Sequence, residues 1–137
     1  GDLGYVDNEG YLYITGRKKN VIINSYGRNI TPEWVEALAE PYSAIDRLVL
    51  FGDAKGFCVA LVCSSEDEVI VEAAIQALNQ QLPDYAQVLN WTSINLSPLS
   101  HPQLFTLDGG PRRALIAKRF HKQITEMYSN VQPNTAI

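Results

Sequence analysis

Apolar residues occur along the chain in short runs separated by polar turns. The runs are rich in β-branched and aromatic residues and predict six strands: residues 5–6, 11–14, 21–23, 47–51, 57–63 and 87–94. The turns at 7–10 and 52–56 contain glycine and polar residues, so the sequence predicts a β-hairpin at each. A charged stretch at 16–20 interrupts the pattern and marks a joint between the first hairpin and the rest of the chain.

Two helices are predicted between clear start and stop signals. Thr31 and Pro32 supply an N-cap and a first-turn proline for the first helix. Ser65 and Glu68 have the spacing of a capping box and open the second. Apolar residues then recur with helical spacing until Pro83 stops them, which makes the second helix the most clearly marked element of the sequence.

A third helix is predicted over about residues 111–128. Its apolar face is formed by Ile116, Phe120, Ile124 and Met127. Residues 97–103 contain two prolines and are expected to form a loop, and residues 129–137 a frayed or disordered tail. The order of elements indicates an α+β fold, with an N-terminal hairpin followed by a small mixed sheet and about three helices packed on it.

Composition narrows the class of protein. The chain has 137 residues, 46% hydrophobic and 19% charged, which fits one globular domain with a real core. No run approaches the ~18 apolar residues of a membrane span. The net charge of −4 and the lack of a broad basic stripe argue against a dedicated nucleic-acid binder. The chain starts without Met or an apolar leader, and we interpret it as part of a longer protein.

Cysteine and histidine are sparse. Cys58 and Cys63 lie in one predicted strand, about 16 Å apart and beyond disulfide reach. Neither they nor His101 and His121 have the spacing of a metal site. We therefore expect free thiols, no bound metal and a cytoplasmic location.

The most unusual chemistry lies in residues 16–36. Three consecutive cations, Arg17 to Lys19, follow a glycine, and a turn-rich loop then leads to a helix N-terminus, where backbone N–H groups favour anions. Taken alone, the segment is consistent with a phosphate-bearing partner. The alternative is that the three cations only form a solvated edge.

Three segments together carry a resemblance to a known family: residues 1–5 (GDLGY), 10–23 (GYLYITGRKKNVII) and 27–36 (GRNITPEWVE). They resemble the adenylate-forming superfamily, which includes acyl-CoA synthetases, nonribosomal peptide adenylation domains and beetle luciferases. GRKKN followed by VII and a GxNxxPxxVE segment is most similar to long-chain acyl-CoA synthetases and fatty acyl-AMP ligases. The resemblance implies a hairpin and hinge at 1–19, a C-terminal lid domain at 20–128 and a tail at 129–137.

The resemblance also implies roles for single residues. Asp2 matches the aspartate that hydrogen-bonds the ribose of ATP and AMP, a role that suits a carboxylate because it accepts two O–H donors. Arg17 matches an arginine that contacts the nucleotide, and Lys19 matches the hinge about which the C-terminal domain turns. Tyr26 and Gly27 match a loop that faces the coenzyme A channel, where a missing side chain leaves room for a thin ligand.

One position departs from the family pattern. Near the C-terminus the family carries a lysine that bonds the reacting carboxylate and phosphate during adenylation. In the matching stretch, residues 108–113, Gly110 occupies the place of that lysine. Arg112 and Arg113 are candidate substitutes, although arginine is not a neutral exchange for lysine. The alternative is that both arginines begin the last helix and face solvent.

The implied function is that of a swivelling domain in an AMP-forming ligase. A carboxylic acid, expected to be a fatty acid, reacts with ATP to give acyl-AMP, and the acyl group then passes to coenzyme A or a pantetheine thiol. The large N-terminal domain, which would bind the phosphates and Mg, is the expected partner, with a carrier protein as a second. The chain alone should catalyse neither step. The alternative is a non-catalytic interaction module with the same fold.

Overall fold

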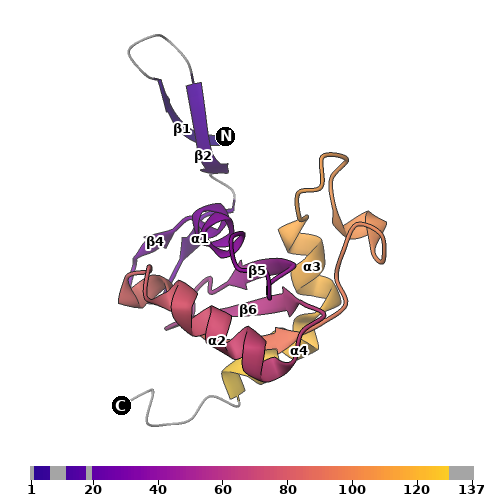
Figure 1. Ribbon diagram of the computed structural model, residues 1–137. Coiled ribbons are helices and arrows are strands. Elements are labelled where there is room, and N and C mark those ends of the chain that lie inside the picture. Colours follow the sequence, from indigo (N-terminus) through magenta and orange to yellow (C-terminus); the bar gives the residue numbers. More distant parts are fainter. Residues whose placement is uncertain (1, 7–11, 18–19, 130–137) are drawn as a thin grey trace.

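The computed structural model describes residues 2–6, 12–17 and 20–129 of the chain and has the expected α+β architecture (Figure 1). Its strands are β1 (Asp2–Val6), β2 (Leu12–Arg17), β3 (Ile22–Ile23), β4 (Asn29–Ile30), β5 (Arg47–Phe51), β6 (Cys58–Cys63) and β7 (Val88–Ser93). Its helices are α1 (Pro32–Ala39), α2 (Glu68–Asn79), α3 (Arg113–Arg119) and α4 (His121–Ser129), with short 3-10 turns at Asp84–Ala86 and Pro102–Leu104. The expected strands and the first two helices are therefore confirmed.

The strands form three small sheets. β1 pairs with β2 and β3 with β4, both antiparallel. The central sheet has the order β5-β6-β7. Its first pair is the expected antiparallel hairpin, and its second is parallel, because the chain crosses over through α2 between β6 and β7. The sheet is therefore mixed, as the sequence predicts.

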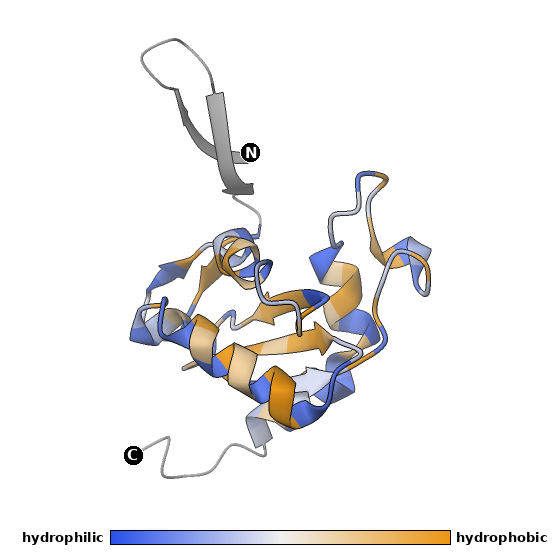
Figure 2. Ribbon diagram, in the orientation of Figure 1, coloured by the Kyte–Doolittle hydropathy of each residue, from blue (hydrophilic) through white to orange (hydrophobic). Residues whose placement is uncertain are grey.

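Alternate residues of the central sheet serve two hydrophobic cores, since side chains along a strand point to opposite faces. On the face covered by α1 and α2, Cys58, Ala60 and Val62 of β6 are buried with Val35 and Leu78. Figure 1 shows α2 lying in front of the sheet, and in Figure 2 strands β5 and β6 are coloured mainly as hydrophobic, while α2 alternates between hydrophobic and hydrophilic residues.

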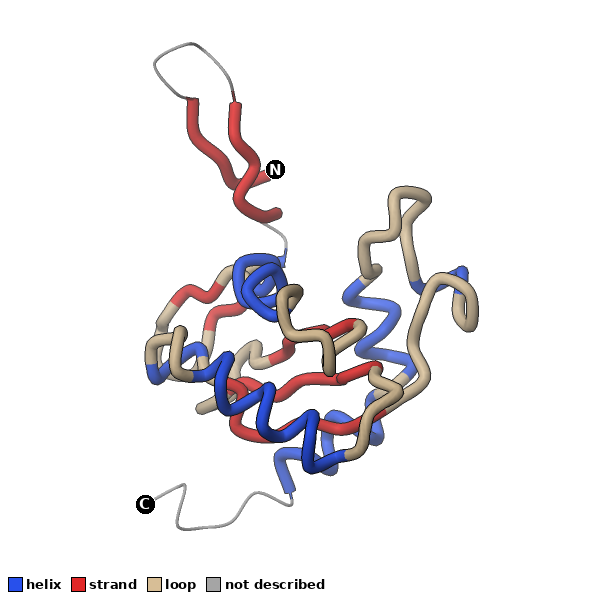
Figure 3. Tube along the Cα trace, in the orientation of Figure 1, coloured by secondary structure: helices blue, strands red, loops and turns tan. Residues whose placement is uncertain are grey.

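The opposite face of the sheet is covered by α3 and α4. Val59 and Leu61 of β6 pack there with Ile116, Phe120 and Met127. The long connection from β7 to α3 contributes three more buried residues to this core: Leu96, Leu104 and Phe105. In Figure 3 this connection is a long loop excursion interrupted only by a short 3-10 turn.

Two details of the sequence prediction are wrong. The third helix is not continuous, because Phe120 leaves the helical conformation (φ −110°, ψ 26°) and separates α3 from α4. Both segments contribute buried residues to the core on the face that they cover, Ile116 from α3 and Met127 from α4. The capping box is also absent: α2 begins two residues later than Ser65 would place it, with Asp67 at its N-cap and no side-chain cap. Ser64 Oγ instead accepts a hydrogen bond from the Glu66 N–H at 3.0 Å, which supports the preceding turn.

Both cysteines are free, as expected. Cys58 is fully buried, and burial raises the pKa of its thiol to about 11. Within the described ranges, no helix combines the length and apolar character of a membrane span. Helix α4 extends to Ser129, one residue into the expected tail, and residues 130–137 of that tail lie outside the described residues.

Candidate functional site

An open groove of about 1080 Å³ runs between β3, the turn after β5, and helices α3 and α4. Asn20, the first described residue after the predicted hinge, lines one side. Gly110, Arg112 and Arg113 line the other, and Lys55 and His121 also border the groove. Asn20, next to the predicted hinge, and Gly110, at the predicted position of the family lysine, are 90 positions apart in the sequence and line the same groove.

The loop that carries Gly110 is closed on itself. Thr106 N–H donates to the Gly110 carbonyl at 2.8 Å, and Gly109 N–H donates back to the Thr106 carbonyl at 3.0 Å. Gly109 has φ +90°, a left-handed conformation that favours glycine. Arg112 N–H donates to the Leu104 carbonyl at 2.8 Å, so the base of the loop is also closed. The result is a compact turn and not an open strand.

Gly110 fits this turn closely. Its N–H donates to Thr106 Oγ1 at 2.9 Å, and a β-carbon at this position would lie 3.2 Å from the same oxygen. Such a contact is tight, so a side chain at 110 requires the Thr106 hydroxyl to shift by a few tenths of an ångström. The turn therefore leaves little room for a side chain at Gly110, the predicted position of the family lysine.

Two arginines tie this loop to strand β5. Arg47, at the start of β5, donates to the Gly109 carbonyl at 3.4 Å and lies over the Phe105 ring, 4.6 Å from its centroid. Arg113, the first residue of α3, donates to the Leu50 carbonyl at 3.2 Å. The loop is therefore anchored at its tip and at its end, both times to the same strand.

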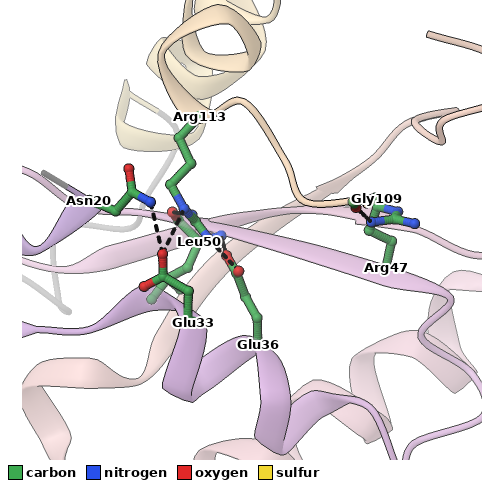
Figure 4. Close-up of polar contacts among 7 residues, drawn as sticks. All are labelled: Asn20, Glu33, Glu36, Arg47, Leu50, Gly109 and Arg113. Atoms are coloured by element: carbon green, nitrogen blue, oxygen red, sulfur yellow. Dashed lines mark hydrogen bonds and ion pairs between the residues drawn. The ribbon is translucent and has the colours of Figure 1, made fainter. Parts of the chain in front are cut away.

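Arg113 is also the centre of a charged cluster (Figure 4). Its side chain is only 10% exposed and pairs with Glu36 of α1, while Glu33 of the same helix lies 3.9 Å from Nε. Glu36 also accepts the Leu50 N–H at 2.8 Å. The expectation that both arginines face solvent is wrong for Arg113. It holds for Arg112, which is exposed and donates through Nε to the Phe105 carbonyl at 3.1 Å.

Glu36 is the most perturbed acid of this cluster. Burial raises its pKa from 4.5 to about 7, because the loss of hydration outweighs the attraction of Arg113 and the hydrogen bonds from Arg113 and Leu50. Sequence reasoning quoted Glu36 within the PxxVE segment but did not identify it as the partner of Arg113. The signal was an acid placed on the inner face of a predicted helix, beside Val35.

The loop after β3 holds Tyr26 and Gly27. Asn24 Oδ1 accepts the N–H groups of both Tyr26 and Arg28 at 2.9 Å and so shapes the turn. Gly27 has φ +81°, and a β-carbon there would meet nothing within 4 Å. Tyr26 is 79% exposed. The loop contacts the turn after β5, since Ser25 N–H donates to the Lys55 carbonyl at 2.9 Å.

The remaining candidate residues lie at the N-terminal hairpin. Asp2 and Arg17 are register partners across β1 and β2, so the structure places the two predicted nucleotide contacts directly opposite each other. Lys19 lies outside the described residues. Among the residues that the structure does describe, no group of three or more His, Cys, Asp or Glu could hold a metal ion.

The chain is similar in sequence to long-chain-fatty-acid–CoA ligases. The chain is 45% identical over 62 residues to the long-chain-fatty-acid–CoA ligase FadD15 of Mycobacterium tuberculosis, covering 45% of this chain and 10% of that protein. It is 33% identical over 101 residues to the long-chain-fatty-acid–CoA ligase ACSBG2 of Rattus norvegicus, covering 72% of this chain and 15% of that protein. The chain thus spans about a tenth to a seventh of these relatives.

Solved structures share the fold. The A domain of carboxylic acid reductase from Segniliparus rugosus, in complex with AMP, superposes with a TM-score of 0.82 at 15% identity, covering 96% of this chain and 23% of that one. A Mycobacterium tuberculosis fatty acyl CoA synthetase gives a TM-score of 0.68 at 21% identity, covering 90% and 24%. Residues 19–132 match the family described as AMP-binding enzyme C-terminal domain. The sequence resemblance is confirmed: the chain belongs to the family of C-terminal domains of AMP-binding enzymes.

Proposed function

We propose that the chain serves as the C-terminal domain of an ATP-dependent acyl-activating ligase. Such an enzyme joins a carboxylic acid to AMP, releases pyrophosphate and passes the acyl group to a thiol. The observation that carries the proposal is the family match over residues 19–132. Similarity to long-chain-fatty-acid–CoA ligases supports a fatty acid as substrate.

The residues of the hairpin and the following loop suit this chemistry. Asp2 and Arg17 lie opposite each other in the hairpin, which supports a shared role in binding the ribose and phosphate of ATP or AMP. Lys19 would be the hinge between the hairpin and the domain. At Gly27 the space that a side chain would fill is open, which fits the passage of a pantetheine arm beside Tyr26.

The thiol acceptor is coenzyme A or the pantetheine of a carrier protein. The similarity to long-chain-fatty-acid–CoA ligases favours coenzyme A. A structural neighbour is described as the A-PCP didomain of a carboxylic acid reductase in complex with AMP, which makes a carrier-bound thiol the second candidate. The Mg ion would be held mainly by the N-terminal domain, which is the expected partner of this chain.

Arg112 is the better candidate for the missing lysine. Arg113 is buried and binds Glu36 and the Leu50 carbonyl, so its charge is already paired with a carboxylate of the same domain. Arg112 lies beside Gly110, is exposed and borders the groove. A permanent cation at this place could stabilise the charge that develops on the reacting carboxylate and phosphate.

The closed turn around Gly110 favours the alternative function, an interaction module that has lost adenylation.

The experiment is ATP–pyrophosphate exchange with a fatty acid, in a polypeptide that joins this chain to its N-terminal domain. Arg112→Ala should lower the exchange rate roughly 10²–10³-fold, the usual effect of losing a charge-assisted contact made in the transition state. Thioester formation from supplied acyl-AMP should survive. Residues 1–137 alone should show no exchange.

The matched variant is Gly110→Lys, which restores the family residue. If Gly110→Lys raises adenylation and Arg112→Ala leaves it unchanged, the site is degenerate and the interaction module is the better description. Robust exchange by residues 1–137 alone would contradict the proposal that the activity needs a second domain. An unchanged rate in both variants would mean that the cation lies on another segment, such as Lys118.

A further inference from the structure

Arg47 lies half-buried at the start of β5, beside the loop that carries Gly110. Its Nη1 donates a long hydrogen bond of 3.4 Å to the Gly109 carbonyl, and its guanidinium carbon lies 4.6 Å from the centre of the Phe105 ring. Figure 4 shows the contact with Gly109 apart from the Arg113 cluster. One side chain therefore contacts both the tip of the loop and the residue at its base.

Phe105 joins this contact to Arg112, the candidate for the missing lysine. The Phe105 residue is 4% exposed and belongs to the core beneath α3 and α4. Its carbonyl accepts the Nε–H of Arg112 at 3.1 Å, and Phe105 also forms a β-bridge with Pro111. Arg47 therefore packs on the ring of the residue whose carbonyl orients Arg112.

The charge of Arg47 has no ion-pair partner in the part of the chain that the structure describes. Arg113, by contrast, pairs with Glu36. A cation that loses part of its hydration without gaining a carboxylate receives little net stabilisation from its surroundings. What remains for Arg47 is its attraction to the Phe105 ring and the Gly109 carbonyl. Its position is therefore better explained by holding the loop than by stabilising the domain as a whole.

We propose that Arg47 is a positioning residue, which fixes the loop through Phe105 and Gly109 and so directs the Arg112 guanidinium toward the groove. The proposal rests on the proposed function in one respect, since that function gives Arg112 its part in adenylation. Of the described residues that line the groove, Arg112 is one and Arg47 is not. Loss of the Arg47 side chain should therefore free Arg112 without removing a cation from the groove.

The first test uses the 137-residue chain and needs no enzyme activity, so its failure is distinct from failure of the proposed function. NMR measures how fast the Arg112 Nε–H and Gly110 N–H protons exchange with water. Arg47→Ala should speed both by at least about tenfold, because their bonds to the Phe105 carbonyl and Thr106 Oγ1 open more often. The amide proton of Leu61, a buried residue of the central strand, reports on global unfolding and should exchange at its native rate.

Arg28→Ala is the matched control. The Arg28 guanidinium carbon lies 4.7 Å from the centre of the Tyr85 ring, so this substitution removes the same kind of contact from a different part of the fold. Proton exchange at Arg112 and Gly110 should be unchanged in this variant. Arg47→Lys keeps a cation but loses the planar guanidinium, so its effect should be intermediate, and it replaces Arg47→Ala if that variant does not fold.

The second test measures adenylation in the polypeptide that joins this chain to its N-terminal domain. Arg47→Ala should lower kcat for ATP–pyrophosphate exchange roughly tenfold and leave KM for ATP unchanged, because Arg112 is misplaced while ATP binding is not. Thioester formation from supplied acyl-AMP should survive, and Arg47→Lys should restore part of the rate.

Three results would overturn the proposal. In Arg47→Ala, the Arg112 proton could exchange at its native rate, or the Leu61 amide could be accelerated by the same factor as the loop protons. In the third, the Arg112 proton responds but kcat does not change. A native joined polypeptide without adenylation would contradict the proposed function instead, and the proton exchange of Arg112 would still decide whether Arg47 positions it.

Discussion

The two faces of the central sheet are built differently. One face is closed by α1 and α2 over the larger core, in which Leu78, Val35 and Ala60 are fully buried. The other is closed by α3 and α4 and by the connection from β7, over a smaller core around Ile116. The loop with Gly110 belongs to the second face. The fold thus keeps most of its apolar burial away from the segment that carries the candidate chemistry.

The largest predicted effect is a loss of stability when a side chain of the larger core is truncated, compared with the same change in the smaller core. Leu78→Ala should lower the free energy of unfolding by about 3–4 kcal/mol, because a fully buried leucine leaves a cavity between α2 and the sheet. Met127→Ala, on the opposite face, should cost about 2 kcal/mol, because Met127 belongs to the smaller core and its neighbours can close part of the gap. Denaturant unfolding measures both. A larger loss for Met127→Ala would reverse the comparison.

The second prediction concerns pH and the cluster that joins the faces. The pKa of Glu36 is raised from 4.5 to about 7 on folding, so between these values the folded protein binds more protons than the unfolded one. The contribution of Glu36 is therefore fully present below about pH 4.5 and is lost as the pH rises to about 7. Relative to Glu36→Gln, the native chain should lose up to about 3 kcal/mol of stability across this range.

The measurement for Glu36 is denaturant unfolding of both chains at a series of pH values. Glu40→Gln is the matched control, since Glu40 lies exposed at the end of the same helix and should show no such difference. If the native chain instead gains stability relative to Glu36→Gln as the pH rises, the attraction of Arg113 outweighs the cost of burial.

The smallest predicted effect lies in the loop. Gly109→Ala should cost about 1 kcal/mol, because alanine is strained at φ +90°. Gly56→Ala is the control: its φ is not in the left-handed region and a β-carbon would meet only ordinary contacts at 3.8 Å or more, so its effect should be near zero. Thermal unfolding measures both. If Gly109→Ala costs as much as Leu78→Ala, the loop is part of the cooperative core after all.

The same contrast explains what the sequence could predict. On the first face, regular spacing and local turn chemistry determine the elements, and strands β5 and β6 and helix α2 were found within a few residues. On the second face, the interruption at Phe120 has no local signal, because phenylalanine is compatible with a helix interior. The break follows from tertiary packing, because the apolar side chains of both α3 and α4 are buried in the same core against the sheet.

The candidate site also contains residues that local motifs identify and residues that only tertiary packing brings together. Gly110 and Gly27 could be singled out because motif spacing is local. The pairing of Glu36 with Arg113 could not, because the two residues are 77 positions apart and their contact exists only once α1, β5 and α3 have packed. The alternative in which Arg113 faces solvent is wrong for this reason. Periodicity placed it at a helix start but gave no information on which carboxylates would face it.

The contacts at Leu50 have a consequence for association between molecules. β5 is an edge strand, and an unpaired edge offers its N–H and C=O groups to a strand from another chain. At Leu50 both groups are already used, the N–H by Glu36 and the carbonyl by Arg113. An incoming strand would have to displace two charged side chains before it could add at this point. The same ion pair that anchors the loop therefore blocks strand addition near the C-terminal end of this sheet edge.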